Sequence, residues 1–189
     1  MDIRDTSSID SAAKQVEARL GESGLNLLIN NAGILTLEQK LEDVTAEGMR
    51  RQFETNCIGP TMVIKRFVPL LRRASQSFSD DRMSTSRAAI VNISSGLGSL
   101  EDNRPRVDLG YRCSKVALNM VTKNMSVMLK ADHILSVAIN PGWVRTDMGG
   151  PGADLSPEES VEGMINVMAT RTNEHSGYCY THKGDLIPR

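Results

Sequence analysis

The chain has 189 residues, enough for one domain with a sizeable core and too few to argue for two. Its 22 basic and 23 acidic residues give a net charge of −1, so the composition favours neither a nucleic acid nor an anionic membrane as a partner. The three cysteines lie far apart and lack metal-ligand spacing, which indicates free thiols in a reducing compartment and no metal site. We therefore treat residues 1–189 as one domain.

The ends of the chain and its apolar runs bear on its expected location. The first ten residues are polar and mildly acidic, so we expect no secretory leader. The apolar stretches all fall far short of the ~20 residues that span a bilayer. The expected location is cytoplasmic, with no membrane partner.

The N-terminal third predicts a helix, a strand and a second, longer helix. Apolar residues recur at helical spacing over residues 7–20, where Ser7 and Asp10 resemble a capping box and Gly21 suits the helix end. Residues 25–29 form a short apolar run that predicts a strand.

The next helical pattern covers residues 45–73, with kinks expected at Pro60 and Pro69. The polar segment 74–87 then predicts a mobile surface loop.

The rest of the chain alternates between predicted strands and helices. The expected elements are a strand at 88–93, a helix at 111–130, a strand at 134–139, a helix at 157–171 and a short strand at 178–180. Because the strands are continuous apolar runs separated by helices, the pattern predicts an α/β fold, a doubly wound parallel sheet with helices on both faces.

A tyrosine and a lysine four residues apart carry the clearest chemical signal. Tyr111 and Lys115 share one face of the predicted helix. An ammonium close to a phenol favours the ionised form, and we expect it to lower the pKa of Tyr111 from about 10 towards neutrality. Such a tyrosine can act as a general acid or base. Ser95, sixteen residues upstream, ends the strand at 88–93 and could hold a substrate oxygen beside the phenol.

Taken singly, these signals are weak. A tyrosine and a lysine at this spacing arise often by chance, and Asn30-Asn31-Ala32-Gly33 could be only a turn that ends a strand. Their placement favours a site, because each lies at the carboxyl end of a predicted parallel strand or on the following helix. Open α/β sheets bind their ligands at that edge.

Together the motifs resemble those of the short-chain dehydrogenase/reductase family. Residues 30–33 are similar to its NNAG segment, Asn56 to its active-site asparagine, Ser95 to its catalytic serine, and Tyr111 with Lys115 to its YxxxK pair. Residues 140–147 are similar to the PG motif that follows the next strand. Residues 141–150 and the ending Ile187-Pro188 are closest to the C-factor-like and sniffer-type carbonyl reductases.

The resemblance implies a Rossmann-like oxidoreductase that depends on NAD(P)(H). It would transfer hydride between the nicotinamide and a small-molecule carbonyl or alcohol. Tyr111 would exchange the proton and Ser95 would polarise the carbonyl oxygen. Lys115 would lower the pKa of the tyrosine and bind the nicotinamide ribose. Asn56 would help a water molecule to relay protons.

The resemblance also implies where the cofactor lies. The family-implied contacts are Asp2 and Ile3 at the adenine, Asn31, Ala32 and Gly33 along the adenosine ribose, Tyr111 and Lys115 at the nicotinamide ribose, and Pro141, Val144 and Thr146 around the nicotinamide. The branch favours NADP, with NAD as the alternative.

Three assignments keep a second interpretation. Ser94 competes with Ser95, Asn56 could instead satisfy backbone groups at a helix kink near Pro60, and Trp143 could be either a lid of the pocket or core.

The chain departs from the family at its N-terminal side. A GxxxGxG motif does not occur in the 189 residues. If Asp2-Ile3 follows the family's third strand, the domain is N-terminally incomplete, with two βα units of roughly 30 residues each upstream of Met1. In the family's strand order, 3-2-1-4-5-6-7, residues 25–29 would then form an exposed apolar edge.

This departure leaves an alternative function open. The chain could be a catalytically impaired isoform or fragment that cannot bind cofactor and acts by dimerising with full-length family members. For either function we expect a homodimer or homotetramer through the helices at 45–73 and 107–131, which resemble those of the family's interface.

Overall fold

The fold is built on a four-stranded parallel sheet. The computed structural model describes residues 1–102 and 108–188. The strands are β1 (Leu27–Asn30), β2 (Ala89–Ile93), β3 (Leu135–Asn140) and β4 (Cys179–Thr181), side by side in the order β1-β2-β3-β4. Because all four run in the same direction, their carboxyl ends meet at one edge of the sheet.

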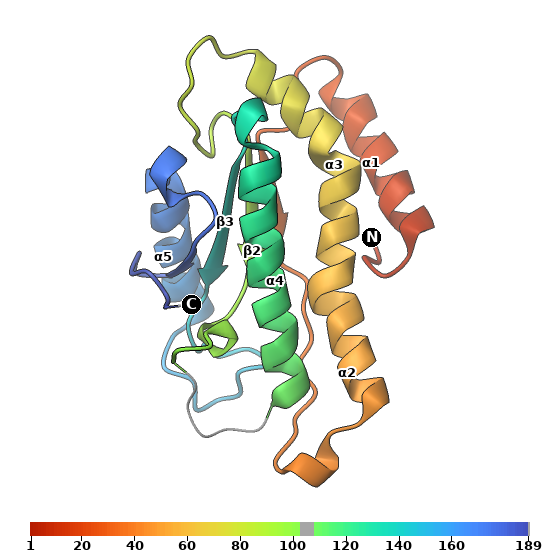
Figure 1. Ribbon diagram of the computed structural model, residues 1–189, viewed down its shortest axis with the longest axis vertical. Coiled ribbons are helices and arrows are strands. Elements are labelled where there is room, and N and C mark those ends of the chain that lie inside the picture. Colours follow the sequence, from red (N-terminus) through yellow and green to blue (C-terminus); the bar gives the residue numbers. More distant parts are fainter. Residues whose placement is uncertain (103–107, 189) are drawn as a thin grey trace.

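Helices cover both faces of this sheet (Figure 1). They are α1 (Thr6–Leu20), α2 (Ala46–Phe53), α3 (Gly59–Gln76), α4 (Leu109–Met128) and α5 (Pro157–Thr170). Helices α3 and α4 lie on one face with α1 packed outside α3, and α5 lies on the other. The predicted doubly wound α/β fold is confirmed, and its elements differ from the predicted boundaries by only a few residues.

Two apolar layers hold the helices to the sheet. Val91, Val137 and Ile139 are fully buried under Val167 of α5. On the other face, Ile90 and Ile134 pack against helix α3. This alternation of side chains from one face to the other is the period-two pattern of a strand buried on both sides.

The long helix predicted at 45–73 is divided into two. A π-helical turn, Glu54–Ile58, separates α2 from α3. Pro60 lies in the first turn of α3, where its missing N–H costs little, and α3 continues through Pro69. The irregular turn therefore contains Asn56, which the sequence placed at the kink, and directly precedes Pro60, while the kinks themselves stay a prediction.

One local prediction was wrong and another holds in part. Asp5, and not Ser7, caps α1, because its carboxylate accepts the N–H of Ser7 at 2.9 Å. The segment predicted as a mobile surface loop at 74–87 is a loop from residue 77 onwards, but it is anchored to the core, and its mobility stays a prediction. Its first residues extend α3, Met83 is buried in the core, and buried Arg87 donates to the hydroxyl of Ser75 at 2.9 Å.

Strand β1 forms an edge of the described sheet, as the sequence predicted. Ile29 on this strand is 43% exposed, so the edge presents an apolar side chain beside unpaired backbone groups. Among residues 1–102 and 108–188, no helix combines the length and apolar character needed to cross a bilayer.

The exposed edge predicts self-association that a charge should reduce. Ile29→Lys places an ammonium on β1, where lysine commonly blocks strand pairing. We expect a smaller oligomeric fraction in sedimentation velocity than for the unaltered chain. Leu41→Lys is the control, because Leu41 is 71% exposed and lies outside the sheet. Equal effects of the two variants would contradict a role for the edge.

Candidate active site

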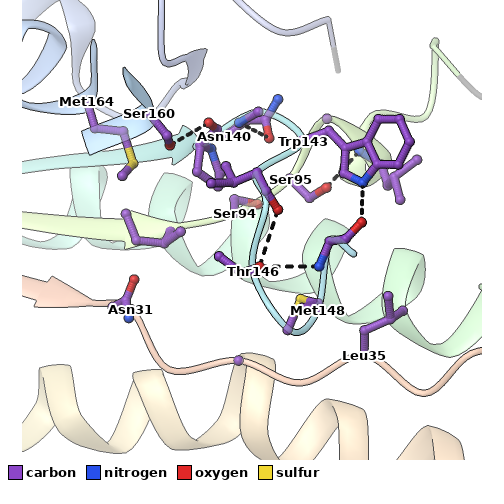
Figure 2. A pocket seen from close by; sticks show the side chains of 18 of the residues that line it. Asn31, Leu35, Ser94, Ser95, Asn140, Trp143, Thr146, Met148, Ser160 and Met164 are labelled. Carbon is purple, nitrogen blue, oxygen red and sulfur yellow. Dashed lines mark hydrogen bonds between the residues drawn. The ribbon is translucent and has the colours of Figure 1, made fainter. Parts of the chain in front are cut away.

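A cavity of about 940 Å³ opens at the carboxyl ends of the strands. Asn31, Ala32 and Gly33 reach it from the segment after β1, Ser94 and Ser95 from the segment after β2, and Pro141, Val144 and Thr146 from the loop after β3. Tyr111 completes its wall from α4. Figure 2 shows Asn31, Ser95 and Thr146 arriving from three different segments. The cavity therefore occupies the ligand-binding edge of an open α/β sheet.

Lys115 is buried beside Tyr111 on α4. It is 4% exposed, its Nζ donates to the carbonyl of Ile93 at 2.8 Å, and this nitrogen lies 5.6 Å from the centroid of the Tyr111 ring. Burial disfavours the charged ammonium and lowers the pKa of Lys115 to about 8. The lysine thus joins the helix to the end of strand β2.

The pKa of Tyr111 moves in the opposite direction to the prediction. Burial of the phenol raises its pKa above 10, and the nearby Ser95 hydroxyl only partly opposes this rise. The predicted lowering by Lys115 is wrong for this structure, because the Lys115 ammonium is directed to the Ile93 carbonyl and burial dominates. The buried phenol is consequently protonated at neutral pH.

The geometry distinguishes Ser95 from its neighbour. Ser94 is 2% exposed and its hydroxyl donates to Oδ1 of Asn119 at 2.6 Å. Ser95 is half-buried at the cavity wall, and its hydroxyl accepts the N–H of Leu97 at 3.1 Å. The Ser95 hydroxyl therefore faces the cavity beside the Tyr111 phenol, whereas the proton of Ser94 is engaged by Asn119.

Asn56 lies inside the π-helical turn with its side chain fully bonded. Its Oδ1 accepts the N–H of Ile34 at 2.8 Å, and its Nδ2 donates to the Ile34 carbonyl and to the hydroxyl of Ser114. Ser114 in turn donates to the carbonyl of Tyr111 at 2.7 Å. These contacts agree with a structural role for Asn56 that connects the segment after β1 to α4, while the water relay stays a prediction.

Gly33 lies where these groups converge. A methyl group added to its Cα would lie 3.3 Å from Oδ1 of Asn56 and 3.5 Å from Nζ of Lys115. Ala32 and Gly33 also border a second cavity of about 490 Å³, which Asp2 and Ile3 line. The two cavities therefore adjoin at Ala32 and Gly33.

The loop after β3 forms the outer wall of the larger cavity. Trp143 is 53% exposed, and its indole N–H donates to the carbonyl of Gly149 at 2.8 Å (Figure 2). Thr146 accepts the N–H of Gly149, and Ser160 of α5 donates to the carbonyl of Pro141 at 2.7 Å. Trp143 is therefore not part of the core, and it lines the cavity, while its role as a lid stays a prediction.

Sequence reasoning missed several polar residues that organise the site. Ser114 donates to the carbonyl of Tyr111, and Asn119 accepts from the hydroxyl of Ser94. Cys179 lies near Lys115, and burial raises the pKa of its thiol to about 12. Ser114 lies beside the recognised tyrosine and lysine, but isolated polar residues carry no spacing signal. In the described part of the chain, acidic, histidine and cysteine side chains form no cluster that could hold a metal.

Comparison with known proteins agrees with this class of site. Residues 1–154 match the short chain dehydrogenase family. C-signal of Myxococcus xanthus is 37% identical over 164 residues, which cover 87% of this chain and 92% of that protein.

Two solved carbonyl reductases share the fold over the whole of this chain. The NADPH-bound enzyme from chicken fatty liver superposes with a TM-score of 0.94 at 39% identity, and this chain covers 75% of it. Carbonyl reductase Sniffer of D. melanogaster superposes with a TM-score of 0.97 at 33% identity, with 76% of it covered.

The fold and the matched family therefore define the chain as a Rossmann-like oxidoreductase. The chain belongs to the short-chain dehydrogenase/reductase family, near its carbonyl reductase branch.

The lowered pKa of Lys115 predicts how stability changes with pH. The folded pKa is about 8 and the reference value 10.5, so between these values the unfolded chain binds more protons than the folded one. The free energy of unfolding should therefore rise with pH over this window, by up to about 1 kcal/mol per pH unit from this residue.

Urea unfolding between pH 7 and 10 checks this, with Lys115→Met as the non-titrating control. As the pH rises, the free energy of unfolding of the unaltered chain should increase relative to that of Lys115→Met. Parallel curves would contradict the burial argument.

Proposed function

We propose that this chain catalyses the reversible reduction of a small-molecule carbonyl compound by NADPH, with Ser95, Tyr111 and Lys115 as the catalytic groups. The observation that carries the proposal is the convergence of these three side chains at one cavity wall and the helix behind it. NADPH is favoured over NADH because the similar carbonyl reductase from chicken fatty liver is NADPH-bound.

The residues act on the carbonyl oxygen. In reduction, the Ser95 hydroxyl donates a hydrogen bond to this oxygen and holds it beside the Tyr111 phenol. Tyr111, protonated at neutral pH, gives its proton to the oxygen as the carbon becomes tetrahedral. Lys115 lies behind the phenol and stabilises the phenolate that forms. When bound, the nicotinamide supplies the hydride that the carbonyl carbon accepts.

The two cavities supply the proposed cofactor contacts. Asp2 and Ile3 would contact the adenine end, and Asn31, Ala32 and Gly33 would lie along the adenosine ribose. Pro141, Val144 and Thr146 would hold the nicotinamide ring. Asn56 would support the proton path through the segment that it fixes.

A role by association is the second candidate. Met120, Val127 and Met128 on α4 are each at least 60% exposed, which is unusual for large apolar side chains on one helix. Assembly through α2, α3 and α4 stays a prediction, and residue 107 of the predicted interface lies outside the described residues. A chain that associates with family members without turning over a carbonyl would support this alternative.

Replacing the proposed acid tests the catalytic assignment. Tyr111→Phe should lower kcat for a carbonyl substrate by at least about 1000-fold, because the proton donor is removed, and should change NADPH affinity less than threefold. Lys115→Ala should weaken both turnover and NADPH binding. Absorbance at 340 nm reports turnover and fluorescence titration reports binding.

Tyr178→Phe is the matched control, since Tyr178 packs at the α5 face and does not line the cavity. Its activity should match that of the unaltered chain. Unchanged turnover in Tyr111→Phe would reject Tyr111 as the acid.

A further inference from the structure

We infer that Glu38 is a positioning residue for Tyr111, supplying from outside α4 the cap that this helix lacks at its own N-terminus. The inference rests on the proposed function, because the importance of Tyr111 is part of that proposal. It starts from a buried carboxylate that neither the catalytic groups nor the cavity walls account for.

Glu38 is a buried acid in the segment between β1 and α2. It is 4% exposed, and its Oε2 accepts the backbone N–H of Gly110 at 3.2 Å. Its backbone carbonyl accepts the N–H of Asp108 at 3.4 Å. Its Oε1 is buried without a hydrogen-bond partner among the residues that the structure describes. A buried acid is costly unless its oxygens are bonded, so the single bond of Oε2 to α4 requires a reason.

The N-terminus of α4 supplies that reason. The first four N–H groups of a helix have no partner within it, and a side chain at the N-cap usually accepts one of them. Asp108, the N-cap, has a left-handed backbone with φ of 35° and makes no side-chain cap. Glu38 replaces that cap at the second helical residue, Gly110. A carboxylate there also interacts favourably with the helix dipole.

Gly110 allows this approach because it has no side chain. A methyl group on its Cα would lie 2.5 Å from Nε2 of Gln52 and 3.4 Å from Oε1 of Glu38. Gln52 is fully buried and its Oε1 accepts the N–H of Thr36 at 3.1 Å, which fixes the backbone two residues before Glu38. The carboxylate is therefore held from its own side as well as by α4.

The capped residue adjoins Tyr111. The first turn of a helix frays most easily, and Tyr111 lies in that turn. Glu38 accepts the N–H of Gly110, the residue before Tyr111, and Ser114 donates to the carbonyl of Tyr111. The phenol thus projects from a backbone that is restrained one residue before Tyr111 and at its own carbonyl, which favours a fixed position for proton transfer.

In an alternative interpretation, the contact between Glu38 and Gly110 serves to stabilise the segment around Glu38 and not α4. In that case α4 would anchor the segment after β1, which begins with the proposed cofactor contacts Asn31 to Gly33. Loss of Glu38 would then weaken NADPH binding first. The two readings therefore separate by whether kcat or cofactor affinity changes.

Three variants test the inference: Glu38→Ala removes the acceptor, Glu38→Gln keeps an acceptor oxygen without the charge, and Glu42→Ala removes an exposed acid nearby. Amide hydrogen exchange followed by NMR, on the chain without cofactor, reports the cap directly. Exchange at Gly110 should accelerate about tenfold or more in Glu38→Ala, stay within about threefold in Glu38→Gln and not change in Glu42→Ala. Exchange at Leu118, in the middle of α4, should stay constant in all three.

Turnover reports the consequence for Tyr111. We expect kcat to fall about tenfold in Glu38→Ala with NADPH affinity within twofold, and Glu38→Gln to recover most of the loss. If Glu38→Ala does not fold, Glu38→Asp takes its place with the same expectations. This variant shortens the side chain by one methylene and so moves the acceptor oxygen away from the N–H of Gly110.

The outcomes test the proposed function and the positioning role of Glu38 separately. An unaltered chain without turnover refutes the proposed function, while the exchange data still test the cap. Turnover with unchanged Gly110 exchange and unchanged kcat in Glu38→Ala overturns the positioning role, as does a loss confined to NADPH affinity.

Discussion

The hydrogen bond from Nζ of Lys115 to the carbonyl of Ile93 is the contact on which the site depends. The bond joins the second turn of α4 to the carboxyl end of β2. It therefore fixes which face of the helix is turned towards the cavity. Tyr111 occupies the same helix face one turn earlier, and Ser95 follows the end of the same strand. The buried lysine therefore joins the helix that carries Tyr111 to the strand that Ser95 follows.

A second network restrains the same helix from the segment after β1. Asn56, in a π-helical turn, bonds both polar groups of Ile34 and reaches Ser114. π-Helical turns inside helices frequently occur at functional sites, because the extra residue redirects a side chain. Here the redirected side chain is an amide that ties three segments together. The helix that carries Tyr111, the proposed proton donor, is thus held by β2 through Lys115, by the π-helical turn through Ser114 and, in our inference, by Glu38.

Much of this arrangement could be predicted from the sequence. Continuous apolar runs such as 88–93 and 134–139 gave the buried strands, because a strand covered on both faces has no polar side. The spacing of Tyr111 and Lys115 placed them on one helix face. The family resemblance then supplied the remaining roles.

Other features depend on tertiary contacts and were out of reach. The bonds between Asn56 and Ile34 join residues that are 22 apart in the chain, so no local pattern reports them. The raised pKa of Tyr111 follows from burial, which the sequence does not report. Glu38 could not be distinguished from its exposed neighbours until its contact with Gly110 was known.

The most direct test of the account is a fluorescence titration of NADPH into the purified chain, with Lys115→Ala in parallel. The account predicts saturable binding, with a shifted nicotinamide emission, that Lys115→Ala weakens at least about tenfold. An absence of saturable binding to a folded chain would contradict it, because the two adjoining cavities would then not hold the cofactor on which the proposed chemistry depends.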